Sequence, residues 1–136
     1  MGLVVDTLSV DCAAPRRLAE WWAQVLGWQV LEDEDPDDDE VAIGDPSGSP
    51  LTLLFLQVPE AKTIKNRLHL DLRPPDGSDQ QTELGRLLGL GARRIDVGQE
   101  VSVSWFVLAD PEGNEFCLLR STPAELAAEA SERSDG

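Results

Sequence analysis

Residues 43–55 read Ile-Gly-Asp-Pro-Ser-Gly-Ser-Pro-Leu-Thr-Leu-Leu-Phe, and residues 108–119 read Leu-Ala-Asp-Pro-Glu-Gly-Asn-Glu-Phe-Cys-Leu-Leu. Each stretch places an Asp-Pro-x-Gly tetrapeptide between two apolar segments. Asp, Pro and Gly at its first, second and fourth positions favour a type I turn, so both stretches predict a β-hairpin. The two turns start 65 positions apart, at Asp45 and Asp110. Self-similarity at a fixed distance predicts a duplicated structural unit.

Length and composition indicate one globular domain. The chain has 136 residues, of which 41% are hydrophobic and 27% charged, enough for a substantial core. We expect the domain to span residues 1–121, as two halves at about 4–58 and 67–120, followed by a short helix or tail at 122–136. The peptide between the halves, 59–66, is expected to be a linker.

The charge excludes several classes of partner. The net charge is −15, so the chain is expected to bind neither nucleic acid nor an anionic membrane. No segment approaches the roughly 20 apolar residues of a membrane span, and no signal peptide is visible. Two cysteines do not make a disulfide framework, which favours the cytoplasm. The acidic run 32–40 is expected to be a solvated loop.

The first half predicts the order strand, helix, strand, strand, strand. Strands are expected at 4–11, 28–31, 41–43 and 51–58. Pro15 is suited to the first turn of a helix, and Gly27 to its C-terminal end. One apolar stripe runs along this helix: Leu18, Trp21, Trp22, Val25 and Leu26.

The second half repeats this order. Residues 67–73 alternate strictly, with Leu68, Leu70 and Leu72 on one predicted face, and Asp71 on the other is expected to pair with Arg67 or Arg73. Ser78 is expected to cap the second helix. Further strands are expected at 92–97, 102–108 and 115–120. Residues 122–125, Thr-Pro-Ala-Glu, match a capping box and predict a C-terminal helix.

Two βαβββ repeats of this kind resemble the vicinal oxygen chelate superfamily, which contains glyoxalases, bleomycin-resistance proteins and extradiol dioxygenases. The resemblance covers about residues 4–120. The resemblance rests on the 110–114 turn, on His69 and on the helix end Trp22-Ala23-Gln24-Val25-Leu26-Gly27-Trp28. Within the superfamily, the chain is similar to the uncharacterised glyoxalase-like domain proteins. It implies an α+β fold: a curved mixed sheet with helices on its outer face and an open concave cavity. Members commonly dimerise, so a homodimer is possible.

The resemblance also implies where a metal would bind. Metal-using members take one ligand from the first strand and one from the last strand of each half. Aligned on the turns, these positions hold Thr7, Thr52, His69 and Cys117. Threonine is a poor ligand for zinc, iron, nickel or manganese, and catalytic ions usually have at least three protein ligands. We therefore expect a degenerate metal site, with no metal and no cofactor. Glu115 could restore a site only if the strand register differed from this count.

Alternation along the strands predicts which residues line the cavity: Thr7, Ser9, Thr52, His69, Asp71, Trp105 and Cys117. Their mixture of polar and apolar types suits a pocket for a small organic ligand, bound without chemistry. The alternatives are a metal-dependent lyase, isomerase or dioxygenase-type enzyme with a non-standard ligand set, and a partner-binding domain. A lone strand His is more often a hydrogen-bonded cavity or core residue than a ligand, and a strand Cys is usually a buried hydrophobe. A nucleophilic Cys117–His69 pair would need a third, orienting residue that the sequence does not identify.

Overall fold

A computed structural model describes residues 2–31, 39–95 and 104–134 of the chain. Most of the acidic run and parts of the strands predicted at 92–97 and 102–108 lie outside the described residues. The chain divides into two compact units, Met1–Thr63 and Ile64–Gly136, and the boundary falls within the predicted linker. Each unit is an open four-stranded mixed sheet with helices, so the predicted α+β class and the two βαβββ repeats are confirmed. A single domain over 1–121 stays a prediction.

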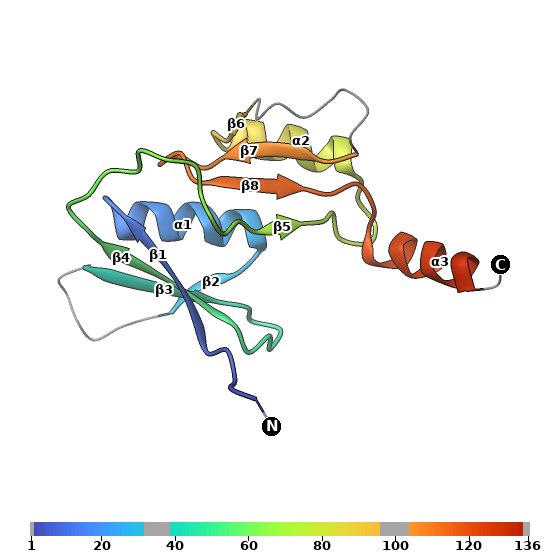
Figure 1. The fold of residues 1–136 in the computed structure, drawn as a ribbon, viewed down its shortest axis with the longest axis horizontal. Helices are drawn as coiled ribbons and strands as arrows, with labels where there is room; N and C mark the ends of the chain where they lie inside the picture. The colour runs from blue at the N-terminus through green and yellow to red at the C-terminus, as the bar shows by residue number, and fades with distance from the viewer. Residues whose placement is uncertain (1, 32–38, 96–103, 135–136) are drawn as a thin grey trace. The chain divides into compact units, whose positions relative to one another are not determined.

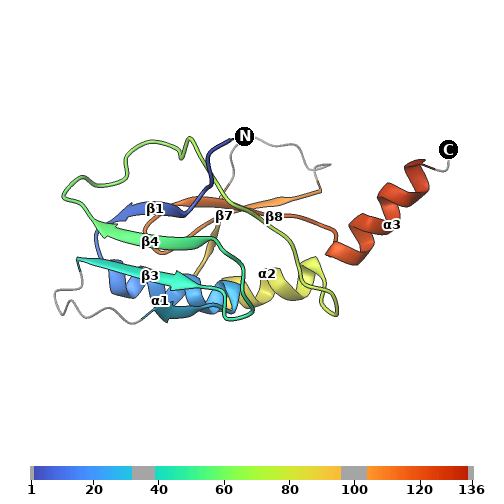
Figure 2. The same cartoon turned by 90° about the horizontal axis from the view of Figure 1, so that it is seen from below.

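The first unit contains β1 (Thr7–Cys12), α1 (Pro15–Leu26), β2 (Gln29–Leu31), β3 (Glu40–Gly44) and β4 (Thr52–Gln57). Its sheet order is β1-β4-β3-β2, with β1 parallel to β4 and the other pairs antiparallel. Figure 2 shows β1, β4 and β3 side by side, and α1 packs against β3 and β4. The strand predicted from Val4 begins only at Thr7.

The apolar stripe of α1 forms the core of this unit, as its spacing predicts. Leu18, Trp21, Trp22 and Val25 are all buried, and they face a sheet whose Ile43 and Phe55 are fully buried. The two tryptophan rings meet edge to face with centroids 5.1 Å apart, a favourable arrangement for aromatic rings. Gly27 ends the helix with φ 69°, the left-handed conformation that favours glycine.

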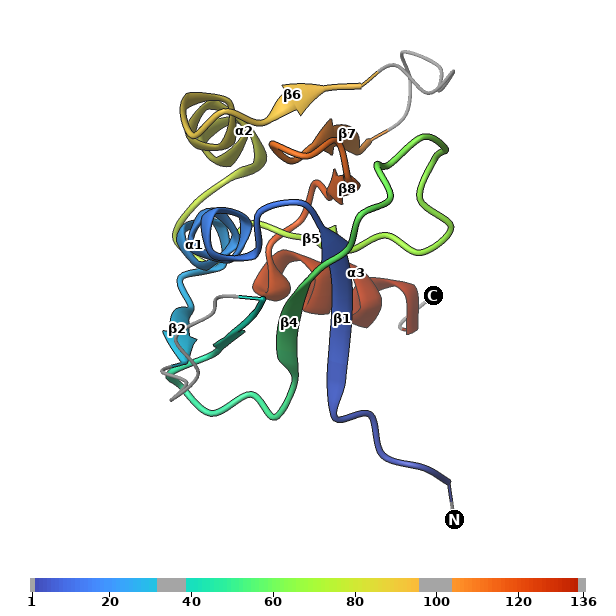
Figure 3. The same ribbon diagram turned by 90° about the vertical axis from the view of Figure 1, so that its left-hand side faces the viewer.

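The second unit contains β5 (Asp71–Leu72), α2 (Gln80–Gly89), β6 (Arg93–Arg94), β7 (Phe106–Ala109), β8 (Glu115–Leu118) and α3 (Pro123–Ser134). Its order, β5-β8-β7-β6, repeats that of the first sheet (Figure 3), and β5 is parallel to β8 as β1 is to β4. Leu108, Phe116 and Leu118 are buried on one face of its sheet, and Leu84 and Leu87 are buried on α2.

Both helix starts in this unit have side-chain caps. The α2 cap is Asp79, whose carboxylate accepts a hydrogen bond from the Thr82 N–H, and not Ser78. The Ser78 hydroxyl donates instead to the Glu83 carboxylate. The capping box predicted for α3 is present: the Thr122 hydroxyl accepts from the Glu125 N–H, and the Glu125 carboxylate accepts from the Thr122 N–H. No helix in the described part of the chain is long and apolar enough to cross a membrane.

The strand predicted at 67–73 is regular only at Asp71–Leu72, and Leu68 is exposed rather than buried. The partner strand β8 begins at Glu115, and the chain bends at residues 67 and 68, so regular pairing does not extend to them. At the other end, Pro74 and Pro75 lack N–H groups and stop the strand.

Candidate functional site

Both predicted turns form, but their hairpins differ in length. The Gly48 N–H donates to the Asp45 carbonyl, and the Gly113 N–H donates to the Asp110 carbonyl, as type I turns require. The first residue pair beyond the turn is Gly44 with Thr52 in the first unit and Ala109 with Glu115 in the second. The first loop is therefore two residues longer, and the structural counterpart of Thr52 is Glu115 instead of Cys117.

In each unit the last strand pairs in parallel with the first, so equivalent residues of the two units can also be identified on the first strands. Thr7 is the Cα partner of Thr52, and Asp71 is the partner of Cys117. His69 lies two residues before Asp71, just ahead of the regular strand, as Glu115 lies two residues before Cys117. His69 is thus the counterpart of Thr7, as the sequence alignment predicted, whereas Asp71 and Cys117 correspond to the pair Ser9 and Leu54.

Glu115 is held by Asn66, a residue that the sequence pattern did not single out. The backbone N–H of Asn66 donates to Glu115 Oε2 at 2.9 Å. In the amide orientation that gives both polar atoms of the Asn66 side chain a partner, its nitrogen donates to the same carboxylate oxygen at 3.2 Å. Its oxygen then accepts a hydrogen bond from the Glu115 N–H at 3.3 Å. The Glu115 carboxylate is thus oriented toward the segment that leads into β5.

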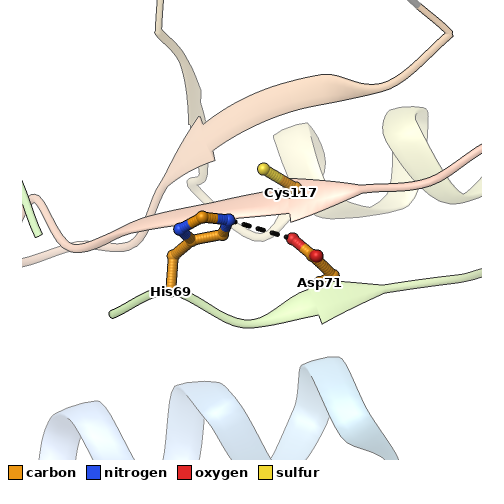
Figure 4. A group of neighbouring side chains, drawn as sticks. All are labelled: His69, Asp71 and Cys117. Atoms are coloured by element: carbon orange, nitrogen blue, oxygen red, sulfur yellow. Dashed lines mark ion pairs between the residues drawn. The ribbon is translucent and has the colours of Figure 1, made fainter. Parts of the chain in front are cut away.

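Three side chains with strong donor atoms converge on one strand pair of the second unit. Imidazole, carboxylate and thiol atoms of His69, Asp71 and Cys117 all lie within 4.8 Å of one another. His69 Nε2 and Asp71 Oδ1 form an ion-pair contact at 3.2 Å, drawn as the dashed line in Figure 4. The expected pairing of Asp71 with Arg67 or Arg73 is replaced by this contact, and Arg73 donates to the Ser121 carbonyl.

The strand pairing fixes Asp71 and Cys117 more firmly than His69. The Cys117 N–H donates to the Leu70 carbonyl at 2.9 Å, and the Leu119 N–H donates to the Leu72 carbonyl at 2.7 Å. His69 precedes the regular strand. The His69 and Asp71 side chains are 45% and 53% exposed, so they can change rotamer, while Cys117 is buried.

The environment of Cys117 keeps its thiol protonated. Burial raises the pKa of Cys117 above its ordinary value, and the charge and hydrogen bond of the Asp71 carboxylate raise it further, against a smaller opposing effect of Lys65. A neutral thiol is a weak nucleophile. This arrangement opposes nucleophilic catalysis by Cys117 in the protein alone.

The other predicted site residues lie in two places. Thr7, Ser9 and Thr52 lie on the β1–β4 pair of the first unit, where the Thr7 hydroxyl donates to the Asp6 carboxylate at 2.7 Å. Trp105 directly precedes β7 in the second unit and is 39% exposed. The structure brings together His69, Asp71 and Cys117. A cavity lined by all seven predicted residues stays a prediction.

Comparisons with known proteins agree with this architecture. Residues 7–119 match the model of the family described as "Glyoxalase-like domain". No curated protein matches the chain significantly.

Solved structures with this fold have little sequence in common with the chain. A hypothetical protein, SA1046 from S. aureus, is 15% identical with a TM-score of 0.65, over 89% of this chain and 95% of that one. The antibiotic binding protein TnmS3 from Streptomyces sp. CB03234 is 20% identical with a TM-score of 0.58, over 89% and 99%. The fosfomycin resistance protein FosX from Mesorhizobium loti is 16% identical with a TM-score of 0.61, over 93% and 97%. At such identities these similarities show the fold alone.

Proposed function

Because the chain belongs to the Glyoxalase-like domain family of the vicinal oxygen chelate superfamily, we propose that it binds a small organic molecule without the four-ligand metal site of its metal-using relatives. Two relatives of known structure are described as an antibiotic binding protein and a fosfomycin resistance protein. The ligand proposed here is of that general kind, a compact natural product or drug-like compound with a few polar groups.

The observation that carries the proposal is the residue pair Thr7 and Thr52. These residues are direct partners on the β1–β4 pair, at the first unit's two expected ligand positions. Neutral hydroxyls bind zinc, iron, nickel and manganese poorly, so the first unit supplies no strong ligand at either position. With only the second unit able to contribute, the two-plus-two ligand set of the superfamily is degenerate.

His69 and Asp71 are the proposed polar recognition groups. Both are about half exposed and in contact with each other, and the Asp71 carboxylate orients the imidazole through Nε2. An oriented imidazole can donate or accept one hydrogen bond through its other nitrogen. Ligand pockets commonly combine a few such groups with apolar walls, for which Trp105 is the aromatic candidate.

A second candidate function is a metal-dependent lyase, isomerase or dioxygenase-type enzyme with a non-standard ligand set. The convergence of His69, Asp71 and Cys117 favours it, because three protein donors and an open position are typical of a catalytic zinc site. The two functions differ in their dependence on metal. Binding should survive a chelator, whereas turnover should require a stoichiometric ion.

A thermal-shift screen tests the proposal. Chelator-treated protein is heated with a panel of aromatic and heterocyclic antibiotics and fosfomycin, and at least one compound should raise the melting temperature. The shift should be lost in His69→Ala and retained in Gln81→Ala, an exposed α2 position that serves as control. A metal-dependent conversion of any compound, with no binding in chelator, would favour the enzyme instead.

A further inference from the structure

We propose that the peptide bond between Asp76 and Gly77 is a site of isoaspartate formation, and that the attachment of α3 to Asp76 controls how fast this modification occurs. The site lies in the loop between β5 and α2 and does not depend on the proposed function. In the described part of the chain, Asp76 is the one aspartate or asparagine that precedes a glycine. A side chain on the following residue hinders the ring closure that this reaction requires, and the prolines after Asp45 and Asp110 have no N–H to take part in it.

The backbone at this site is open to the reaction. The Ser78 N–H donates to the Pro75 carbonyl at 3.1 Å, which closes a turn around Asp76 and Gly77. Gly77 has φ 92°, and no atom lies within 4 Å of the position that a Cβ would occupy. Both residues are exposed, and no group among the described residues accepts the Gly77 N–H. Water can therefore reach the amide nitrogen and the carboxyl group.

The reaction needs only these two residues and water. The Gly77 nitrogen bonds to Asp76 Cγ and loses its proton, and one carboxyl oxygen leaves as water, which gives a cyclic succinimide. Water then adds to either ring carbonyl. Addition at Cγ restores aspartate, whereas addition at the main-chain carbonyl of Asp76 leaves Gly77 attached through Cγ, as isoaspartate. One water leaves and one enters, so the mass of the chain is unchanged and no oxidant takes part.

The helix α3 restrains the carboxylate that must react. Asp76 Oδ1 accepts the Ala124 N–H at 2.9 Å, in the first turn of α3. The first N–H groups of a helix have no acceptors within the helix, so Asp76 acts as a cap from another part of the chain. Rotation of the carboxyl group toward the Gly77 nitrogen breaks this hydrogen bond. The rate of isomerisation therefore depends on how often α3 releases Asp76.

Release of α3 requires little disruption of the second unit. Near its start, the Ser121 hydroxyl donates to Glu129 Oε1 at 3.0 Å, and Arg120 lies 3.6 Å from the same oxygen. The other side chains described for α3, at residues 123–128 and 130–132, are exposed. A helix of 12 residues without a buried face is marginally stable in water. We therefore expect α3 to open more readily than the sheet, as weakly packed elements generally do.

Isomerisation in turn removes the acceptor that α3 uses. Isoaspartate inserts a methylene group into the main chain and leaves a carboxylate bonded directly to Cα, without the methylene of the aspartate side chain. This shorter group no longer reaches the Ala124 N–H from the same backbone position. The new carboxylate also makes the modified chain a substrate for enzymes that methylate isoaspartyl groups with S-adenosylmethionine.

Ageing of the purified full-length protein at neutral pH tests the proposal. Isoaspartate is measured by transfer of a labelled methyl group from S-adenosylmethionine, catalysed by an isoaspartyl methyltransferase. The label should accumulate with time in the tryptic peptide 68–86, which contains Asp76 and excludes the second Asp-Gly sequence at 135–136. Asp76→Glu should lose this label, because its longer side chain closes the ring far more slowly.

A pair of variants at Leu126, an exposed position of α3, separates the role of the helix from that of the local sequence. The Leu126 N–H donates to the Thr122 carbonyl, so Leu126→Pro removes this bond and breaks the first turn, whereas Leu126→Ala keeps the helix. Leu126→Pro should acquire label several-fold faster than the wild type, and Leu126→Ala at the wild-type rate. Glu129→Ala, which removes the contacts with Arg120 and Ser121, provides the same test if Leu126→Pro does not fold.

Three results would overturn the proposal. The first is the absence of label from peptide 68–86 in both the aged wild type and the variants that release α3. The second is label in Asp76→Glu at the wild-type level. The third is equal rates of labelling in Leu126→Ala and in the variants that release α3, which would show that the helix does not control the reaction.

Discussion

Asp71 and Cys117 are direct partners in the parallel pairing of β5 with β8, and the Asp71 carboxylate lies close enough to the Cys117 thiol to raise the pKa of that thiol. Because the raised pKa keeps the Cys117 thiol protonated, this thiol is a weak nucleophile in the protein alone.

Asp71→Asn should make Cys117 more reactive. Removal of the carboxylate lowers the pKa of Cys117 toward its ordinary value, although burial, the largest cause of the increase, remains. In a Cys12→Ser background, the pH at half-maximal alkylation by iodoacetamide should shift downward in Asp71→Asn. An identical pH profile in the two proteins would show that the carboxylate does not act on the thiol.

The same cysteine should contribute to alkaline unfolding. The pKa of Cys117 is raised in the folded protein, so its contribution to stability is complete below the ordinary value of 9.0 and is lost as the pH rises through the folded value. The difference in unfolding free energy between wild type and Cys117→Ala should therefore shrink between neutral pH and the alkaline range. Urea unfolding curves at several pH values measure this difference, and a pH-independent difference would contradict the assignment.

The two repeated turns should respond differently to the same substitution. Asp110 is fully buried, and its Oδ1 accepts from the N–H groups of Glu112 and Asn114. Asp110→Ala leaves these donors unsatisfied and should cost about 2–4 kcal/mol of stability, given the cost of unpaired buried groups.

Asp45→Ala is the matched control, because the Asp45 carboxylate makes comparable contacts with Ser47 at the protein surface. We expect only a small change in its urea midpoint. Equal destabilisation by the two substitutions would mean that burial does not distinguish the turns.

The contribution of the α2 N-cap residue Asp79 to stability should depend on pH. Hydrogen bonds from Thr82 lower the pKa of Asp79, so its contribution is present above the ordinary value of 3.8 and is lost as the pH falls through the folded value. Asp79→Ala should thus be less stable than wild type at neutral pH, with the difference narrowing in acid. Ser78→Ala is the matched comparison, because the Ser78 hydroxyl donates to the Glu83 side chain and does not cap the helix. If Ser78→Ala lost more stability than Asp79→Ala, the cap assignment predicted from the sequence would be restored.

Local patterns were sufficient to predict most of the fold. Asp-Pro-x-Gly turns, the apolar stripe of α1 and the Thr122–Glu125 capping box each depend on residues close in sequence, and all of them form. The end of a strand depends on its partner. The strand predicted from the alternation at 67–73 is therefore longer than β5, because β8 starts too late to pair with residues 67 and 68.

The candidate site was only partly predictable for a related reason. Cys117 was taken as the counterpart of Thr52 because both lie seven positions after the turn aspartate. The two hairpin loops differ by two residues, and this difference appears only in the strand pairing. Asp71 was expected to pair with an arginine, since nothing in the sequence shows that His69 lies within 3.2 Å of it.

Isothermal titration calorimetry in the presence of a chelator tests the central claim, that this glyoxalase-like protein binds a small organic molecule through His69 without requiring a metal. The best compound from the thermal-shift screen should bind the wild type at a single saturable site. It should bind His69→Ala at least tenfold more weakly and Gln81→Ala with unchanged affinity. Absence of binding by the wild type in chelator, with binding or turnover restored by a stoichiometric divalent ion, would contradict the claim.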